Sequence, residues 1–430
     1  MAWCAMSTTL AMHLMAVALF IGVPAHAAEL RGHGGPVRSI AVTADGQAAI
    51  TGSFDTRAII WSLETGEARE VLLFHEGQVN AVAALPDGRF ASAGTDGRIA
   101  VWEIGRSAPV SVLQGHTAPV AALGVSPDGS AIASASWDGS VRLWPLAGGK
   151  PRILTGHRGN VNAVAFLSDR TLVSAGYDAA VMLWPRDQGG VPRRIDMPAP
   201  LNTLAIAGND RLFAGGADGK LYELNRSGDV QGEVQISSKP IVAAAASADG
   251  RYLAAAGIGE PIVLLHASDL KTARTLGGRE TVWSLAFSAD GKTLLAGGGD
   301  HLVREWDIET GARLGAAAQG TPDPMAEYAG NPDAEVFRAC IACHTLDPDD
   351  GNRAGPTLHG IFGRRIASVP DYHYSPAFRQ MDIVWTPETV SKLFELGPSK
   401  YTPGTKMPEQ TISNPEDRAA LIRFLQAETR

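Results

Sequence analysis

The sequence predicts a multidomain chain in which a large all-β domain made of seven repeats precedes a small all-α domain. Tryptophan recurs through the first part of the chain at Trp61, Trp102, Trp144 and Trp184, at spacings of 41, 42 and 40 residues. Each repeat also carries an Asp-containing turn signal between two β-rich runs. After residue 332 the pattern changes to amphipathic helical segments around two closely spaced cysteines.

The composition indicates a globular chain. Its 430 residues favour two or three domains. Hydrophobic residues make up 45% and charged residues 19% of the chain, so large cores can form. The net charge of −8 argues against nucleic acid as a partner, because nucleic-acid-binding proteins present basic surfaces.

Residues 1–27 have the pattern of a cleaved signal peptide. The stretch Leu10–Val23 is apolar, and Ala25–Ala27 offers small residues at a cleavage site. No Lys or Arg precedes the apolar stretch, so Met6 or Met12 are alternative starts. An uncleaved anchor is the other alternative, but a membrane-spanning helix needs about 20 apolar residues. We therefore expect export, and no integral membrane segment once the signal is removed.

The repeats extend from residue 28 to residue 318. Stepping on from Trp184 by the same interval reaches Leu224, Leu265 and Trp306, which gives seven units. Asp and Gly suit the turn of each unit because they tolerate the backbone angles of tight hairpins. The turns are Ala44–Gly46, Pro86–Gly88, Pro127–Gly129, Ser168–Arg170, Asn209–Arg211, Ala248–Gly250 and Ala289–Gly291.

Two further motifs make residues 28–318 resemble the WD-repeat β-propeller family. Gly-His pairs open units one, three and four, and Ser136–Trp144 follows the family pattern closely. The resemblance implies a seven-bladed propeller in which a His, a Ser or Thr, an Asp and a Trp of one unit form a buried hydrogen-bonded set. The expected sets are His33, Thr51, Asp55 and Trp61; His75, Ser92, Asp96 and Trp102; His116, Ser134, Asp138 and Trp144; and His157, Ser174, Asp178 and Trp184.

Units five to seven lack the histidine and have Ala214, Ala255 and Ala296 at the Ser/Thr position, so we expect apolar packing there. The resemblance also implies how the ring closes. Residues 28–31 should pair with the third strand of blade seven, with residues 312–316 as the competitor. No catalytic residue is predicted in the propeller, and fold alone does not assign a function.

Residues 319–332 are rich in Pro and Gly and are predicted to form a linker. The pentad Cys340–His344 follows it, with two thiols three positions apart and a histidine directly after the second. This spacing is typical of c-type heme attachment. A zinc site would need further ligands, but the chain has only 3 cysteines and the remaining one is Cys4. A thioredoxin-like pair does not require His344.

The segment 333–430 resembles a class I cytochrome c of the mitochondrial and photosynthetic-bacterial type. The matching features include predicted helices at 333–340 and 416–428, with Phe337 and Phe424 as their expected contact. The resemblance implies an all-α domain with one covalent heme c on Cys340 and Cys343. It also makes His344 an iron ligand.

Further cofactor-binding residues follow from the same resemblance. The Pro356 carbonyl would hold the ring N–H of His344, and Arg364, Tyr374 and Trp385 would surround a heme propionate. The loop 401–407 contains Thr405, assigned to cofactor binding, and brings Met407 to the iron as the second metal ligand. Met381, His359 and His373 are the alternative ligands.

These features predict a periplasmic c-type cytochrome that transfers single electrons, with the propeller as a protein-docking module. Two alternatives stay open: an enzyme whose propeller binds a substrate or second cofactor, and a redox-sensing scaffold. From residue 319 on, 11 Lys and Arg stand against 15 Asp and Glu. The lysine ring that steers mitochondrial cytochromes is therefore missing, which points to a different redox protein partner.

Overall fold

The computed structural model describes residues 29–430, except for certain positions. These are 107, 169–170, 187–188, 279, 315–324, 326–327, 329, 338–339, 342–343, 348–354, 371, 373, 375, 404–406, 408–410, 413 and 430. The side chains of 168, 209, 376, 377 and 399 are also left out. The expected signal peptide and two of the predicted site residues, Cys343 and Thr405, therefore lie outside the described residues.

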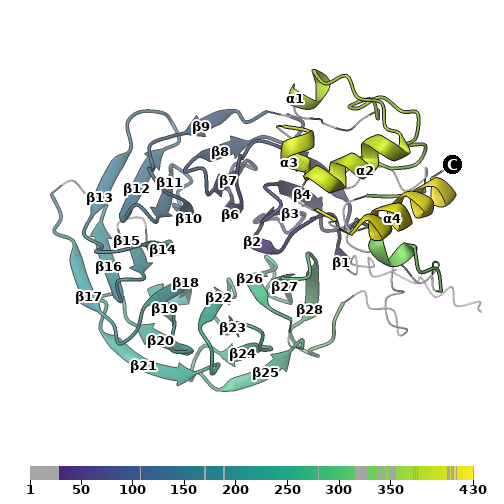
Figure 1. Cartoon of the computed structure of the whole chain (residues 1–430). Coiled ribbons are helices and arrows are strands. Elements are labelled where there is room, and N and C mark those ends of the chain that lie inside the picture. Colours follow the sequence, from purple (N-terminus) through teal and green to yellow (C-terminus); the bar gives the residue numbers. More distant parts are fainter. Residues whose placement is uncertain are drawn as a thin grey trace, which may run out of the picture.

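The strands form seven four-stranded antiparallel sheets arranged in a ring (Figure 1). Six sheets use four consecutive strands each, and the seventh has the order β1-β28-β27-β26. The strands are β1 (Glu29–Leu30), β2 (Val37–Val42), β3 (Ala48–Ser53), β4 (Ala58–Ser62), β5 (Ala68–Leu72), β6 (Val79–Ala84), β7 (Phe90–Gly94), β8 (Ile99–Trp102), β9 (Ser111–Leu113), β10 (Val120–Val125), β11 (Ala131–Ser136), β12 (Ser140–Pro145), β13 (Arg152–Thr155), β14 (Val161–Ser168), β15 (Thr171–Gly176), β16 (Ala180–Pro185), β17 (Arg193–Asp196), β18 (Leu201–Ala207), β19 (Arg211–Gly216), β20 (Lys220–Leu224), β21 (Val230–Gln235), β22 (Ile241–Ala246), β23 (Tyr252–Gly257), β24 (Ile262–His266), β25 (Thr272–Leu276), β26 (Val282–Phe287), β27 (Thr293–Gly298) and β28 (Val303–Asp307), with the 3-10 turn η1 (Gly208–Asp210) before β19.

The seven-bladed propeller predicted from the repeats is confirmed. Blades five and six form even though Leu224 and Leu265 stand where the first four units have Trp. Both leucines are fully buried, at 0% exposure. An apolar side chain at this position is thus enough to fill the core of a blade in which the polar set is absent.

The first four blades contain the four expected hydrogen-bonded sets. In blade one the indole Nε1 of Trp61 lies 2.7 Å from the hydroxyl oxygen of Thr51, and the ring of His33 joins that hydroxyl to the carboxylate of Asp55 at 2.7 and 2.9 Å. Blades two to four repeat this geometry with a serine hydroxyl in place of the threonine.

The chemistry of the groups gives these contacts a direction. An indole N–H can only donate, so the hydroxyl accepts a hydrogen bond from Trp and can donate its own hydrogen bond to His Nε2. The other ring nitrogen then donates to the carboxylate. This arrangement needs a neutral imidazole, and burial lowers the pKa of His116 and of His157, which favours that form. The recurring histidines are therefore explained by structure rather than by catalysis.

Blades five to seven pack without this set. Ala214, Ala255 and Ala296 are buried where the other blades have a hydroxyl, as expected. In blade five a tyrosine contacts the aspartate of the turn, since the Tyr222 hydroxyl donates to Asp218. The ring thus combines four blades with buried polar sets and three held mainly by apolar side chains.

Replacing Ser92 with alanine is expected to destabilise the propeller by about 2 kcal/mol, because His75 and Trp102 would each lose a buried partner. Equilibrium urea unfolding followed by circular dichroism measures the effect. Ser111→Ala, on the exposed edge strand of the same blade, is the control and should change stability by less than about 0.5 kcal/mol. Equal stability of the two variants would contradict the role given to the buried hydroxyl.

The N-terminal strand closes the ring, and the pairing expected of residues 28–31 is confirmed at Glu29 and Leu30. Glu29 and Leu30 of β1 pair antiparallel with Arg304 and Val303 of β28. The competing segment uses the rest of the same edge: the Leu314 amide donates to the Glu305 carbonyl at 2.8 Å. Both ends of the propeller therefore share the outer edge of β28.

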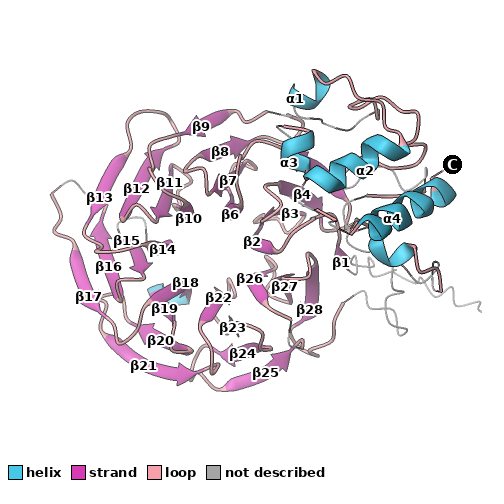
Figure 2. Ribbon diagram, viewed as in Figure 1, coloured by secondary structure: helices cyan, strands magenta, loops and turns pink. Residues whose placement is uncertain are grey.

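The helices follow the propeller in the chain and lie beside the ring (Figure 2). They are η3 (Ala334–Phe337), a 3-10 turn, and the α-helices α1 (Pro376–Arg379), α2 (Pro387–Leu396), α3 (Pro398–Tyr401) and α4 (Pro415–Glu428). The side chains of Thr386 and Asn414 cap α2 and α4, each of which begins with proline. None of the described helices is long and apolar enough to cross a membrane.

The part of the chain that contains η3 and α1–α4, called the helical part from here on, has its own apolar core. The ring centroids of Phe337 and Phe424 are 5.1 Å apart, which confirms the contact expected between the two ends of this segment. The helix expected over 416–428 is present as α4. The one expected over 333–340 is described only as η3, a 3-10 turn over Ala334–Phe337. Beyond it, the amide of His344 donates to the carbonyl of Cys340 at 3.0 Å, a bond of helical spacing.

The stretch 319–332 was predicted to be a linker, but part of it packs into the core of the helical part. Met325, which falls inside 319–332, is only 3% exposed and belongs to the core of the helical part. Tyr328 packs against the same core, with its ring 5.0 Å from that of Phe424. The apolar side chains within this Pro- and Gly-rich stretch explain the difference, because they can be buried against the helices.

Candidate functional site

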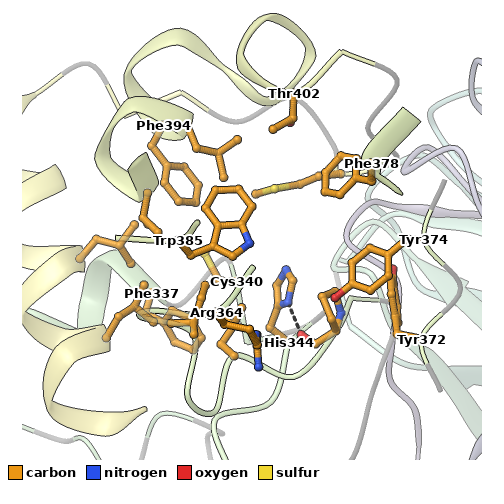
Figure 3. A pocket seen from close by; sticks show the side chains of 18 of the residues that line it. Phe337, Cys340, His344, Arg364, Tyr372, Tyr374, Phe378, Trp385, Phe394 and Thr402 are labelled. Atoms are coloured by element: carbon orange, nitrogen blue, oxygen red, sulfur yellow. Dashed lines mark hydrogen bonds between the residues drawn. The ribbon is translucent and has the colours of Figure 1, made fainter. Parts of the chain in front are cut away.

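The helical part surrounds a cavity of about 980 Å³, counting the space open to solvent. Its wall is mostly apolar, and it lies within the size range of small-molecule and cofactor sites. Figure 3 shows Thr402 and Phe394 at one end of the cavity and His344 and Arg364 at the other, with Trp385 between them. Of the nine site residues predicted from the sequence, seven line this cavity: Cys340, His344, Pro356, Arg364, Tyr374, Trp385 and Met407.

His344 is oriented by the loop that follows the pentad. Its Nδ1 lies 2.7 Å from the carbonyl oxygen of Pro356, as Figure 3 shows. A carbonyl can only accept, so Nδ1 donates, and in the neutral ring Nε2 is the nitrogen that holds a lone pair. A neutral imidazole held in this way is ready to bind a metal ion through Nε2.

Gly355 explains why the ring fits so closely against this loop. A Cβ atom at this position would lie 2.4–2.8 Å from three atoms of the His344 ring, which is too close for any side chain. Glycine is therefore required here by the approach of the imidazole. Gly355 directly precedes Pro356 in the chain, but the sequence pattern alone does not assign it this part.

Cys340 lines the cavity and stands three positions after the last residue of η3. It is 8% exposed and packs within the same core as Phe337 and Phe424. Burial raises the pKa of its thiol to about 12, so the free thiol is neutral. Metal ions bind the thiolate form of cysteine, so a neutral thiol among apolar side chains is a poor metal ligand. Its surroundings suit a covalent bond to an apolar group better.

Arg364 and Trp385 are brought together by backbone pairing. The amide of Trp385 donates to the carbonyl of Arg364 at 2.9 Å, and the amide of Gly363 donates to the carbonyl of Trp385 at 2.8 Å. The guanidinium of Arg364 donates to the carbonyls of His359 and Thr357, both at 2.7 Å. Burial lowers the pKa of Arg364, but an arginine stays charged, so a fixed cation stands beside the cavity.

Tyr374 forms part of an aromatic wall on the cavity. Its ring lies 4.8 Å from that of Tyr372 and is stacked on Phe378 at 6.1 Å. Burial raises the pKa of Tyr374, so its hydroxyl stays protonated and can donate a hydrogen bond. Tyr372 and Phe378 were not among the predicted site residues, since nothing in the sequence pattern of their segment distinguishes them.

Met407 lines the cavity and packs against the helical core. Among the described residues, the alternative ligands Met381 and His359 do not line it, and His373 lies outside the description. The cavity thus brings together an imidazole, a thioether and a thiol within an apolar wall. Such a donor set suits an iron porphyrin held by sulfur and nitrogen ligands.

The propeller and the helical part resemble two different groups of known proteins. The WD40 family (WD domain, G-beta repeat) matches residues 25–62, 66–103, 107–145, 148–185 and 270–307. These five matches correspond to units one to four and unit seven. The two unmatched units are those in which leucine replaces the tryptophan.

Curated relatives of a second kind match about a quarter of the chain. Cytochrome c of Cochliobolus lunatus is 45% identical over 98 residues, which is 23% of this chain and 90% of that protein. Cytochrome c of Arabidopsis thaliana is also 45% identical over 98 residues, 23% of this chain and 87% of its own length. A cytochrome c homolog of Rickettsia typhi is 41% identical over 104 residues, 24% of this chain and 59% of that protein.

Proposed function

The chain belongs to the cytochrome c family over a stretch of 98 residues and carries WD40 repeats, and from this premise we propose that it is an electron carrier. In this proposal it holds one covalently bound heme c, and its propeller docks it onto other proteins. The single observation that carries the proposal is the cavity that His344, Met407 and Cys340 line together.

We place the cytochrome stretch at residues 333–430, as a small all-α class I domain. Two observations support this position. The WD40 matches end at residue 307, and the longest stretch that they leave free is the one after it. The helices η3 and α4 meet through Phe337 and Phe424 in that same stretch, and they enclose the candidate site.

Cys340 and Cys343 would hold the heme through thioether bonds, with His344 and Met407 as the two iron ligands. Arg364, Tyr374 and Trp385 would surround a propionate, and Thr405 lies in the loop that carries Met407. When bound, the heme supplies a one-electron couple, and imidazole opposite thioether raises its potential. The hydrogen bond from His344 Nδ1 to the Pro356 carbonyl and the apolar wall of the cavity support this assignment.

The side chains of the cavity would do three things for electron transfer. The Pro356 carbonyl fixes the protonated nitrogen of His344 and so keeps Nε2 available. The apolar wall would exclude water, and Met407 as an iron ligand would fill the position at which a substrate could otherwise bind. A filled ligand set favours a carrier over an enzyme.

We further propose export to the periplasm after removal of residues 1–27. Covalent heme attachment in this family takes place outside the bacterial cytoplasm, which supports export. The excess of acidic residues after residue 319 favours a redox partner with a basic docking surface. The rigid propeller with its loops on two faces would provide a second docking surface.

The proposal is tested on the full chain produced with its own leader in a host that attaches heme c. We expect one heme per chain that stays attached after denaturation, a mature N-terminus at residue 28, and a one-electron redox titration. Absence of covalent heme would refute the cofactor assignment. Turnover of a small substrate by the purified protein would favour the enzyme alternative instead.

A further inference from the structure

Two propeller residues line the cavity of the helical part: Arg57 and Leu73. Arg57 directly precedes β4, and Leu73 directly follows β5. Because Ala58 pairs with Leu72, the two cavity residues face each other one step further along the same strand pair. Figure 1 shows the helices beside β3 and β4 of this blade. Blade one therefore forms one side of the candidate heme site.

The corresponding arginine of blade two shows that this placement is particular to Arg57. The backbone register places Arg98 at the same position, and both arginines donate their amide to the aspartate of their own blade. The guanidinium of Arg98 then folds back to pair with Asp96 and Glu76, at 2.9 and 3.1 Å. Arg57 is only 4% exposed and is one of the residues that line the cavity, whereas Arg98 is not.

The aspartates of the two blades accept the same kinds of hydrogen bond but differ in burial. Asp55 and Asp96 each accept from the histidine ring, from the amide of the residue after that histidine and from the arginine amide. Asp55 is fully buried within its blade, whereas Asp96 is partly open and also pairs with the guanidinium of Arg98. The side chain of Arg57 lines the cavity of the helical part.

We infer that the propeller completes the heme site, with Arg57 as a fixed cation beside the heme and Leu73 as part of the apolar wall. The inference rests on the proposed function, since it assumes that the cavity holds heme. An arginine keeps its charge even when buried, and charges interact strongly where water is excluded. Ferric heme carries one more positive charge than ferrous heme, so Arg57 opposes oxidation and raises the reduction potential.

This arrangement couples the two domains. Arg57 and Leu73 belong to the propeller, so a change at blade one also changes the surroundings of the bound heme. Arg57 is a positioning residue in this scheme, because it acts on the heme through its charge and is not an iron ligand.

The test compares Arg57→Gln with Arg98→Gln in the full, heme-loaded chain. For Arg57→Gln we expect the equilibrium between the two oxidation states to shift about tenfold toward the ferric form, a potential lower by about 59 mV. Arg57→Lys should retain most of the native potential, and Arg98→Gln should leave it unchanged. Equal potentials for Arg57→Gln and Arg98→Gln would overturn the inference.

A second pair of variants avoids the buried polar set of blade one. Leu73→Glu places a negative charge at the cavity and should also stabilise the ferric form. Gln114→Glu makes the same charge change at the matching position of blade two and should have no effect. If Leu73→Glu leaves the potential unchanged, the propeller does not form part of the site. Heme content, measured in every variant, separates this failure from failure of the proposed function, in which no variant carries heme.

Discussion

Replacing Cys340 with alanine is expected to remove most of the covalently attached heme and to unfold the helical part, while the propeller stays folded. Cys340 lies in the core with Phe337 and Phe424, around a cavity of about 980 Å³. Without heme this apolar cavity stays largely unfilled, and an unfilled core is strongly destabilised. The propeller has separate apolar clusters between its blades and contributes no iron ligand.

The loss is measured by heme absorbance per chain and by circular dichroism of the two types of secondary structure. Cys340→Ser preserves the size of the side chain and should lose the heme equally, because the thioether bond is missing. Ser92→Ala is the reciprocal control, since it weakens the propeller and should keep the heme. Collapse of the β signal in Cys340→Ala would show that the two domains do not fold independently.

Replacing Met407 with alanine is expected to open the iron to external ligands. Thioether ligation gives ferric heme a weak absorption band near the red end of the visible spectrum, and the variant should lose this band. Its reduction potential should fall, because a thioether favours the ferrous state. Carbon monoxide should bind the ferrous variant readily, whereas the native ferrous protein should bind it poorly.

Met381→Ala is the matched control for this experiment. Met381 is the other methionine considered as a ligand, and among the described residues it does not line the cavity. The control should keep both the band and the resistance to carbon monoxide. Loss of the band in Met381→Ala, or its survival in Met407→Ala, would refute the assigned ligand. Ready binding of carbon monoxide by the native protein would remove the main support for a carrier.

The parts of the fold that repeat were predictable from the sequence. The hydrogen-bonded set of Trp61 and His33 recurs at one position per unit, so its four copies could be placed directly from the repeat pattern. Blades five and six could be placed by the interval alone, although Leu224 replaces the tryptophan. The assignment of each blade can be checked against the others, because every unit must satisfy the same spacing.

Contacts that occur only once were not predictable in this way. Arg57 and Arg98 occupy equivalent positions, yet only Arg57 lines the cavity, because its direction depends on the neighbouring domain. The burial of Met325 within the expected linker is similar, since a Pro- and Gly-rich composition does not show which apolar residues will find a core. The pentad predicted His344 as a site residue, and His344 does line the cavity, but the requirement for Gly355 became clear only from the approach of the ring.

The closure of the ring by β1 has a consequence for the order of folding. Leu30 pairs with Val303, and the hydroxyl of Ser284 contacts the carbonyl of Val37 across 247 residues of chain. Such contacts form late, because the entropy of closing a long loop is lost before they stabilise the fold. Of the described strands, β1 is the first to be synthesised, and it can pair only after β28, the last of them, has been made. Until then β28 exposes an unpaired edge, at which another chain could add a strand. Fast completion of the last blade therefore shortens the time for which this edge stays open.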